Sequence, residues 1–310
     1  MAPSTETSAR VGSASELAKF AAGLSVFTAL SLIGVKAVAY LASGSVAVLG
    51  SLFDSGLDLI SSVIAFAAVR LSAEPADGEH RFGHAKAEAI AGLAQSVIIA
   101  LSAAFVAREA VSRLIAPQDI AQGGWAMAAM AYSILATAIL AAVQTAAIRR
   151  SQSLAVEADR AHYIGDLAAN LGVLLAIAAA SLGWLRADGL AGLGVAGLLG
   201  WSAVHILSKS LPQLMDQELS DRDRAQILKI VHQHTEAKGV HALRTRRAGR
   251  DLFIQFHLEL DPEMALAAAH DVAVEIEGEL RAAFPGADII IHQDPHGLDE
   301  PHDEFGRPEA

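Results

Sequence analysis

The chain has 310 residues, of which 53% are hydrophobic and 18% charged, and its mean hydropathy is positive. This composition is typical of a polytopic membrane protein rather than of a soluble globule. The formal net charge of −11 argues against a nucleic-acid partner, and the absence of cysteine excludes disulfides and thiolate metal sites. Any metal must therefore be held by His, Asp or Glu. The N-terminal stretch 1–15 is polar, does not resemble a secretory signal and is expected to be disordered.

Six apolar segments come next in the chain, and each is long enough for a membrane-spanning helix, which needs about 20 residues. They lie at roughly 17–41, 46–72, 84–115, 123–148, 155–185 and 188–210. Their connections are short, apart from the polar stretch "SAEPADGEHRFGH" at 72–84. The sequence therefore predicts a transmembrane domain of six helices over residues 16–211.

The basic residues of the connections are distributed unequally between the two sides of the membrane. With six spans both termini share one side, which collects Arg10, Lys19, Arg70, Arg81, Lys86, Arg149 and Arg150. The opposite side holds Arg186 and the less clearly placed Arg108 and Arg113. Because cytoplasmic loops carry the excess of Lys and Arg, we expect both termini and the C-terminal domain to be cytoplasmic.

Residues 212–295 are polar and predict a small α+β domain, followed by a tail, 296–310, that is expected to be disordered. The stretch 221–236 and the stretch "MALAAAHDVAVEIEGELRAAF" favour helices, while "VHALRTRRAG", "RDLFIQFHLELD" and "ADIIIHQD" favour strands. The apolar face of the second strand consists of Leu252, Ile254, Phe256, Leu258 and Leu260. The stripe of the second helix consists of Leu266, Ala269, Ala273, Ile276 and Leu280. The order αββαβ fits a ferredoxin-like split sheet.

Two stretches, "GSLFDSGLDLISS" (50–62) and "AHYIGDLAAN" (161–170), place ionisable side chains inside apolar, helix-like runs. Asp54 and Asp58 are four residues apart, as are His162 and Asp166, so each pair lies on one face of its helix. If the two faces meet, three carboxylates and one imidazole supply a complete tetrahedral shell for Zn²⁺, and such a set also suits Cd²⁺ or Fe²⁺.

The alternative explanation is that these acids pair with basic side chains or lie near the membrane interface. A charged residue near the bilayer centre costs at least about 2.5 kcal/mol on insertion scales. Lys36 is the only Lys or Arg deep in the first two spans, and one lysine cannot neutralise three acids. A divalent cation bound between the two helices is therefore the better explanation.

These features together resemble the cation diffusion facilitator family, most strongly its bacterial zinc and ferrous-iron exporters. The resemblance covers roughly residues 16–295 and includes "GSLFDSGLD", "DGEHRFGHAKAE", "HYIGDLAAN", "HALRTR", "FIQFHLELD" and "DIIIHQDP". It implies a homodimeric transporter of the bacterial inner membrane, not an enzyme, that moves a divalent metal out of the cytoplasm in exchange for protons. Members with Asp at the place of His162 resemble manganese carriers, so the imidazole favours Zn²⁺, Cd²⁺ or Fe²⁺.

The resemblance also assigns metal ligands residue by residue. The transport site matches Asp54, Asp58, His162 and Asp166. A second site in the loop matches Asp77, His80 and His84. A binuclear site in the C-terminal domain matches His241, His257, His270, His292 and Asp294, with Gln293 beside them. Lys86 and Asp216 match an interlock between two protomers. The alternative explanation for the loop and C-terminal sites is ordinary solvated histidines. Without the resemblance, Lys86 and Asp216 would be read as an ordinary surface pair, and no role follows for His232, His234, His296 and His302.

Two other classes of function remain open at this point. The spans could serve only to anchor a metal sensor in the membrane, but an anchor needs no intramembrane acids. A proton- or sodium-coupled carrier of a small organic solute would show spans broken by Gly or Pro around its site. No Pro lies within the six predicted spans. A proton-coupled exporter of divalent metal is therefore the leading hypothesis.

Overall fold

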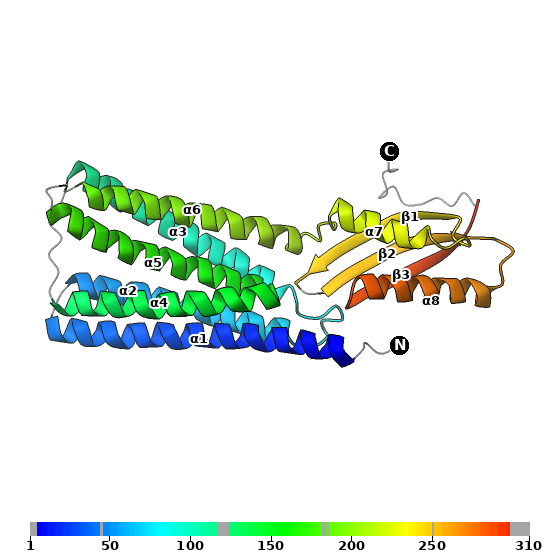
Figure 1. Ribbon diagram of the computed structural model, residues 1–310, viewed down its shortest axis with the longest axis horizontal. Coiled ribbons are helices and arrows are strands. Elements are labelled where there is room, and N and C mark those ends of the chain that lie inside the picture. The colour runs from blue at the N-terminus through cyan, green and yellow to red at the C-terminus, as the bar shows by residue number, and fades with distance from the viewer. Residues whose placement is uncertain are drawn as a thin grey trace. The chain divides into compact units, whose positions relative to one another are not determined.

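A computed structural model describes residues 5–43, 46–116, 124–181, 184, 186–249 and 251–297. Within these residues the chain forms two compact units, with the boundary in sequence between Leu214 and Met215. One unit is a bundle of six helices, and the other is a small α+β domain (Figure 1).

The bundle consists of α1 (Thr5–Ser43), α2 (Val46–Ser72), α3 (Ala87–Ile115), α4 (Gly124–Ser151), α5 (Leu154–Ser181) and α6 (Ala187–Leu214). Five of these helices are long and apolar enough to cross a bilayer. The sixth is α5, a helix of 28 residues whose first half carries Glu157, Asp159, Arg160 and Asp166. The prediction of a multi-pass helical membrane region is confirmed.

Two helix ends differ from the sequence-based expectation. The segment 1–15 was expected to be disordered, but α1 begins at Thr5. No proline follows Thr5 in this stretch, so the helix of the apolar span extends towards the N-terminus without a break. The last helix of the bundle, α6, continues through Pro212 to Leu214, because a proline in the last turn removes only one backbone hydrogen bond. The expected disordered tail lies outside the described residues from position 298 onward.

α5 is the central helix of the bundle, since it contacts α2, α3, α4 and α6. Much of the bundle interior is made of small side chains, among them Ala65 of α2, Ala91 of α3 and Ala155 of α5. Small residues allow helices to approach closely, which is the usual basis of helix association in a membrane. The charged first half of α5 is therefore covered by protein.

α3 and α6 lie very close together at two glycines of α6. A methyl group at Gly189 would lie 2.9 Å from the backbone oxygen of Ala110, and one at Gly192 would lie 2.8 Å from the Cβ of Ala110. Carbon atoms do not approach neighbours this closely, so neither position accepts a side chain without moving the helices apart.

The C-terminal domain contains α7 (Asp221–Val231), β1 (Gly239–Ala248), β2 (Asp251–Leu260), α8 (Leu266–Ala283) and β3 (Ala287–Pro295). β2 is the central strand of a three-stranded sheet, antiparallel to β1 and parallel to β3. The predicted αββαβ order is confirmed, and α8 supplies the crossover that a parallel strand pair requires. The first helix is shorter than expected and ends at Val231.

The core of this domain lies between the helices and the apolar face of β2. Ile254, Phe256 and Leu258 are at most 1% exposed and pack with Ile276 of α8. The predicted apolar face of β2 is therefore confirmed. Leu266 is 81% exposed and does not join the predicted stripe of α8, because it is the first residue of the helix, before the turns that lie on the sheet.

The register of the strands brings three histidines side by side on the sheet. His257 of β2 pairs with His241 of β1 and with His292 of β3. Both pairings follow from the alignment of whole strands, so the position of these histidines depends on the register of the sheet rather than on local structure.

The glycine contact between α3 and α6 generates a stability prediction. We expect Gly189→Ala to lower the stability of the detergent-solubilised protein by about 1–3 kcal/mol, because the added methyl group overpacks the interface. Gly194→Ala is the control, since a methyl group there meets nothing within 4 Å. Thermal unfolding monitored by circular dichroism is the measurement. Equal unfolding temperatures for the two variants would show that the close approach of α3 and α6 is wrong.

Candidate metal centres

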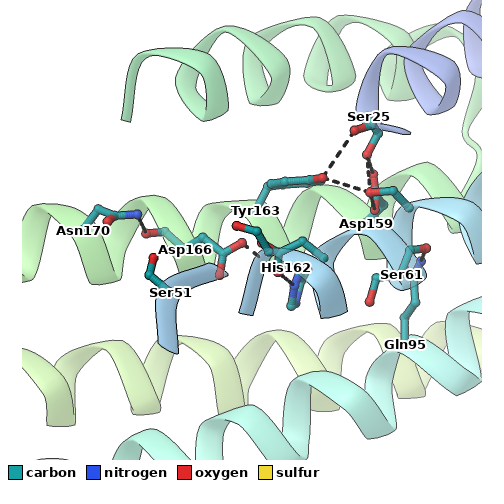
Figure 2. A network of polar contacts seen from close by, with 12 residues as sticks. Ser25, Ser51, Ser61, Gln95, Asp159, His162, Tyr163, Asp166 and Asn170 are labelled. Carbon is teal, nitrogen blue, oxygen red and sulfur yellow. Dashed lines mark hydrogen bonds and ion pairs between the residues drawn. The ribbon is translucent and has the colours of Figure 1, made fainter. Parts of the chain in front are cut away.

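The first candidate centre joins α2 to α5 inside the bundle. His162 Nε2 lies 2.8 Å from Asp58 Oδ1 and 3.9 Å from Asp166 Oδ2. Asp58 and His162 are buried, and each of the three groups offers a ligand atom within 4.8 Å of the others. Figure 2 shows His162 and Asp166 on neighbouring turns of α5. The structure thus brings together three of the four predicted transport ligands.

Asp54 is the predicted ligand that does not join this cluster. It is exposed and lies one helical turn before Asp58 on α2. Lys36 of α1 reaches the same part of α2, where its ammonium donates to Ser55 Oγ at 2.7 Å and to the backbone oxygen of Ser51 at 3.1 Å. A fixed positive charge is therefore held at the turn of α2 that carries Asp54.

The local sequence of α5 explains how its two ligands are presented. His162 and Asp166 are four residues apart and therefore lie on one helical face. Gly165, between them, faces α6, where an added methyl group would collide with the side chain of Leu199. The glycine lets α5 lie close to α6 while the ligands point towards α2.

Asp159, one turn before the cluster on α5, is the centre of a second buried polar group. It is 1% exposed. Its carboxylate accepts hydrogen bonds from three other helices, namely from Ser25 on α1 (2.5 Å), Ser62 on α2 (3.2 Å) and Gln144 on α4 (2.8 Å). Figure 2 shows Asp159 with Ser25 and Tyr163 around it. The sequence-based interpretation missed Asp159, although an acid within a predicted span is itself a signal of function.

The loop between α2 and α3 forms the second candidate centre. The Asp77 carboxylate lies 3.5 Å from His80 Nδ1 and 3.4 Å from His84 Nε2, and the two imidazoles approach to 3.2 Å. The backbone N–H groups of His80 and Glu79 donate to Asp77 and lower the pKa of its carboxyl. The ionised carboxylate is therefore favoured, which is the form that a divalent cation requires of this ligand. All three residues predicted for this site lie together.

The third candidate centre surrounds Asp294 of β3 in the C-terminal domain. Asp294 Oδ2 lies 2.7 Å from His257 Nδ1 and 3.3 Å from His241 Nε2. Its Oδ1 lies 3.0 Å from His292 Nε2. One buried carboxylate thus contacts three of the predicted histidines. His270, the remaining predicted ligand, is an exposed residue of α8 and is not part of the cluster among the residues that the structure describes.

Glu259 of β2 adds a second carboxylate to this centre. Its Oε1 lies 2.9 Å from His241 Nδ1, and its Oε2 lies 2.7 Å from His296 Nδ1. These hydrogen bonds, the one from His296 foremost, lower the pKa of Glu259. His241 lies between Glu259 and Asp294, an arrangement that orients a metal-binding imidazole. Glu259 was missed, although its spacing of two residues from His257 places it on the same face of β2.

The two residues of the predicted interlock belong to different units of the structure. Lys86 precedes the first turn of α3. Asp216 forms a 3.0 Å ion pair with Arg246 of its own domain. The interlock between protomers stays a prediction.

The histidines without an assigned role are placed as follows. His232 lies within hydrogen-bond distance of the backbone oxygen of Leu228, and His234 lies 3.4 Å from Glu279. Both contacts are local to the C-terminal domain. His302 lies outside the described residues.

The third centre depends most on Asp294, because this carboxylate contacts three histidines. We expect Asp294→Ala to weaken Zn²⁺ binding at the C-terminal domain by about 10–100-fold. The measurement is calorimetry on the full-length protein that also carries Asp58→Ala and Asp77→Ala, so that neither the intramembrane centre nor the loop centre contributes to the signal. Asp288→Ala removes an exposed acid from the same strand and should bind like the parent. The assignment fails if Asp294→Ala and Asp288→Ala bind Zn²⁺ equally well.

Comparisons with known proteins agree with this organisation. Residues 23–215 match the family model of the cation efflux transmembrane domain, and residues 219–296 match that of the cation efflux protein cytoplasmic domain. The chain is 41% identical over 277 residues to the cation-efflux pump FieF of Shewanella oneidensis, a match that covers 89% of this chain and 94% of the relative. It is 39% identical over 267 residues to FieF of Salmonella arizonae, covering 86% of this chain and 89% of the relative.

One solved structure matches about a quarter of the chain. The metal-bound C-terminal domain of the CzcD transporter from Thermotoga maritima is 28% identical, with a TM-score of 0.25, and the match covers 26% of this chain and 93% of that chain. The two family models together span most of the sequence, and the FieF relatives align with nearly all of it. The chain therefore belongs to the cation diffusion facilitator family of metal cation efflux transporters.

Proposed function

We propose that this protein exports Zn²⁺, Cd²⁺ or Fe²⁺ from the cytoplasm in exchange for protons. The observation that carries the proposal is the contact of His162 with Asp58 and Asp166 inside the helix bundle. Three ionisable groups on two spans are costly in a bilayer unless a function requires them. A site with one imidazole suits zinc-like cations better than a site of carboxylates alone.

In this proposal Asp54 completes the site as a fourth ligand once a cation is present. Asp54 lies one turn from Asp58 on the same helix, so a change of its side-chain rotamer with a small adjustment of α2 would bring it to the cation. The positive charge of the cation provides the attraction, and four N/O ligands complete a tetrahedral shell. In the empty site, Lys36 supplies the nearby positive charge instead.

Proton exchange follows from the chemistry of these ligands. A ligating imidazole must be neutral and a ligating carboxylate ionised, so protons and metal compete for the same lone pairs. Metal that enters from the cytoplasm displaces protons, and protons from the outer side help to eject the metal. The distribution of Lys and Arg supports cytoplasmic termini and, in a bacterium, insertion into the inner membrane.

The two other centres are accessory sites in this scheme. The C-terminal domain acts as a metal-dependent regulator and as a contact between two protomers, with Lys86 and Asp216 as an interlock between them. The match of residues 219–296 to a dimerisation-type cytoplasmic domain supports this part of the proposal. A membrane-anchored metal sensor without transport is the second candidate, but it leaves the buried cluster of Asp58, His162 and Asp166 unexplained.

Single ligand deletions test the transport site. We expect Asp54→Ala, Asp58→Ala and Asp166→Ala each to abolish Zn²⁺ flux into proteoliposomes with an imposed pH gradient, because each removes a ligand of the cation. Glu109→Ala is the control, since it removes an exposed acid of α3 that pairs with Arg113. All variants should insert and remain monodisperse. Normal flux through Asp54→Ala would remove Asp54 from the site, and normal flux through the other two would end the transport assignment.

A second test concerns the pH dependence of metal binding. We expect the apparent Zn²⁺ affinity to fall as pH drops from about 7.5 to 6, because an unperturbed imidazole becomes protonated near pH 6.5. In His162→Asp the midpoint should move to lower pH, since a carboxyl group titrates lower, and selectivity should shift towards Mn²⁺. The measurement is calorimetry on protein in which Asp294→Ala and Asp77→Ala remove the C-terminal and loop centres. An affinity that does not change over this pH range would exclude proton exchange at this site.

A further inference from the structure

Asp159 is the most buried carboxylate among the described residues, and the proposed transport cycle does not use it. Within the described part of the chain no Lys, Arg or His forms an ion pair with it. Its three hydrogen-bond donors, Ser25, Ser62 and Gln144, are all neutral. A buried acid in a membrane span with only neutral partners is the kind of group that calls for a functional explanation.

The hydrogen bonds alone do not explain why this residue is an acid. Ser25, Ser62 and Gln144 could hold four helices together equally well around an amide side chain, which has both donors and an acceptor. An amide also avoids the cost of a potential buried charge. What a carboxyl group adds at this position is the ability to gain and lose a proton.

The surrounding hydroxyl groups can satisfy Asp159 in both protonation states. When Asp159 is ionised, Ser25, Ser62 and Gln144 all donate to it. When it is protonated, its own O–H can donate to Ser62 Oγ, which then donates to the Tyr163 hydroxyl at 2.9 Å. Tyr163 in turn donates to the backbone oxygen of Ser25 at 3.4 Å. Rotation of hydroxyl groups is sufficient for the change, so no buried polar group loses its partner.

This network lies directly beside the candidate transport site. Asp159 precedes His162 by three residues on α5, which is about 4.5 Å along the helix axis. Ser62 follows Asp58 by four residues on α2, so the two helices make both sets of contacts on successive turns. A divalent cation in the cluster therefore lies close enough to favour the ionised form of Asp159, whereas an empty cluster with its own acids favours the protonated form.

Other charged groups on the helices packed around Asp159 have partners or positions of their own. His162, one turn further along α5, belongs to the cluster itself, together with Asp58 and Asp166. On α1, Glu16 pairs with Lys19 and Lys36 with Ser55, and on α2 Asp54 is exposed and Arg70 lies over Phe66. On α3, Glu88 bonds to Ser72 and Ser153, Glu109 pairs with Arg113, and Arg108 is exposed. Arg149 and Arg150 are exposed on α4, Glu157 pairs with Lys209 of α6, and Arg160 bonds to Thr145. The cation in the cluster is therefore the charge that changes most next to Asp159 during transport.

We propose that Asp159 is a proton-carrying residue separate from the metal ligands. It holds a proton on its carboxyl group while the cluster is empty, and it releases that proton to the aqueous phase when a divalent cation binds. After the cation has left, the carboxylate takes up a proton again. The inference rests on the proposed antiport and adds a residue that exchanges a proton without ever contacting the metal.

Asp159→Asn tests this role, because an asparagine retains the shape and the hydrogen bonds but cannot ionise. The measurement is Zn²⁺ calorimetry at about pH 6 in buffers of different ionisation enthalpy, on full-length protein with Asp294→Ala. We expect Asp159→Asn to bind Zn²⁺ and to release fewer protons per ion than the parent, by up to about one. Its affinity should also depend less steeply on pH. Ser133→Ala is the matched control, since this buried serine of α4 donates to its own helix.

Each outcome bears on a different claim. Equal proton release by the parent and by Asp159→Asn would overturn the role of Asp159 and leave the antiport intact. A parent protein that releases no protons on binding Zn²⁺ would overturn the antiport, and the role of Asp159 with it. If Asp159→Asn does not fold, Gln144→Leu provides the answer. It removes a donor to the ionised form, so the pH midpoint of proton release should rise, and an unchanged midpoint would overturn the proposal.

Discussion

The contact between Asp58 and His162 is the interaction on which the membrane domain depends most. It joins α2 to α5 across 104 residues of sequence in the interior of the bundle. Ionisable side chains cannot face lipid without a large cost, so the helix that carries His162 and Asp166 must be covered by its neighbours. The central position of α5, in contact with α2, α3, α4 and α6, meets this requirement. Alanine and glycine at the helix contacts make such close packing possible.

On α2 and α5, the candidate metal ligands and the neutral hydrogen-bond donors lie on successive turns. Around His162 the groups are an imidazole and carboxylates, which bind zinc-like cations. One turn away, Ser62 and Gln144 join α2 and α4 to Asp159 through neutral donors. Hydroxyl and amide groups are weak ligands for such cations, so they hold the helices in place without competing for the metal. The cluster is thereby supported by contacts that use none of its own metal-binding groups.

In the C-terminal domain the alignment of strands brings the candidate metal ligands together, as helix packing does in the bundle. The parallel pairing of β2 with β3 places His257 beside His292 and Glu259 beside Asp294. The antiparallel pairing of β1 with β2 adds His241, just before an irregularity in the ladder. A shift of one residue in either pairing would turn these side chains to the opposite face of the sheet. The metal centre is therefore specified by the apolar face of β2, which fixes the register from the other side of the sheet.

The sequence by itself determined the features that depend on local periodicity. The six helices, the αββαβ order and the apolar face of β2 follow from hydrophobic patterns with periods of 3.6 and 2 residues. The position of Asp58 in the apolar run of α2 can likewise be read from the local sequence. The same holds for the spacing of four residues between His162 and Asp166 on α5. The loop residues Asp77, His80 and His84 could be grouped because they are close in sequence, and a short turn keeps them close in space.

Only the tertiary structure decided which side chains meet across elements. In the folded protein, Asp54 lies one turn outside the cluster and His270 lies on the exposed side of α8. It also revealed two acids that sequence spacing did not single out, Asp159 with donors from α1, α2 and α4, and Glu259 between two histidines. The physical reason is that helix rotation and strand register are set by packing over the whole domain. A pattern along one helix or strand cannot specify the partner that another element brings to it.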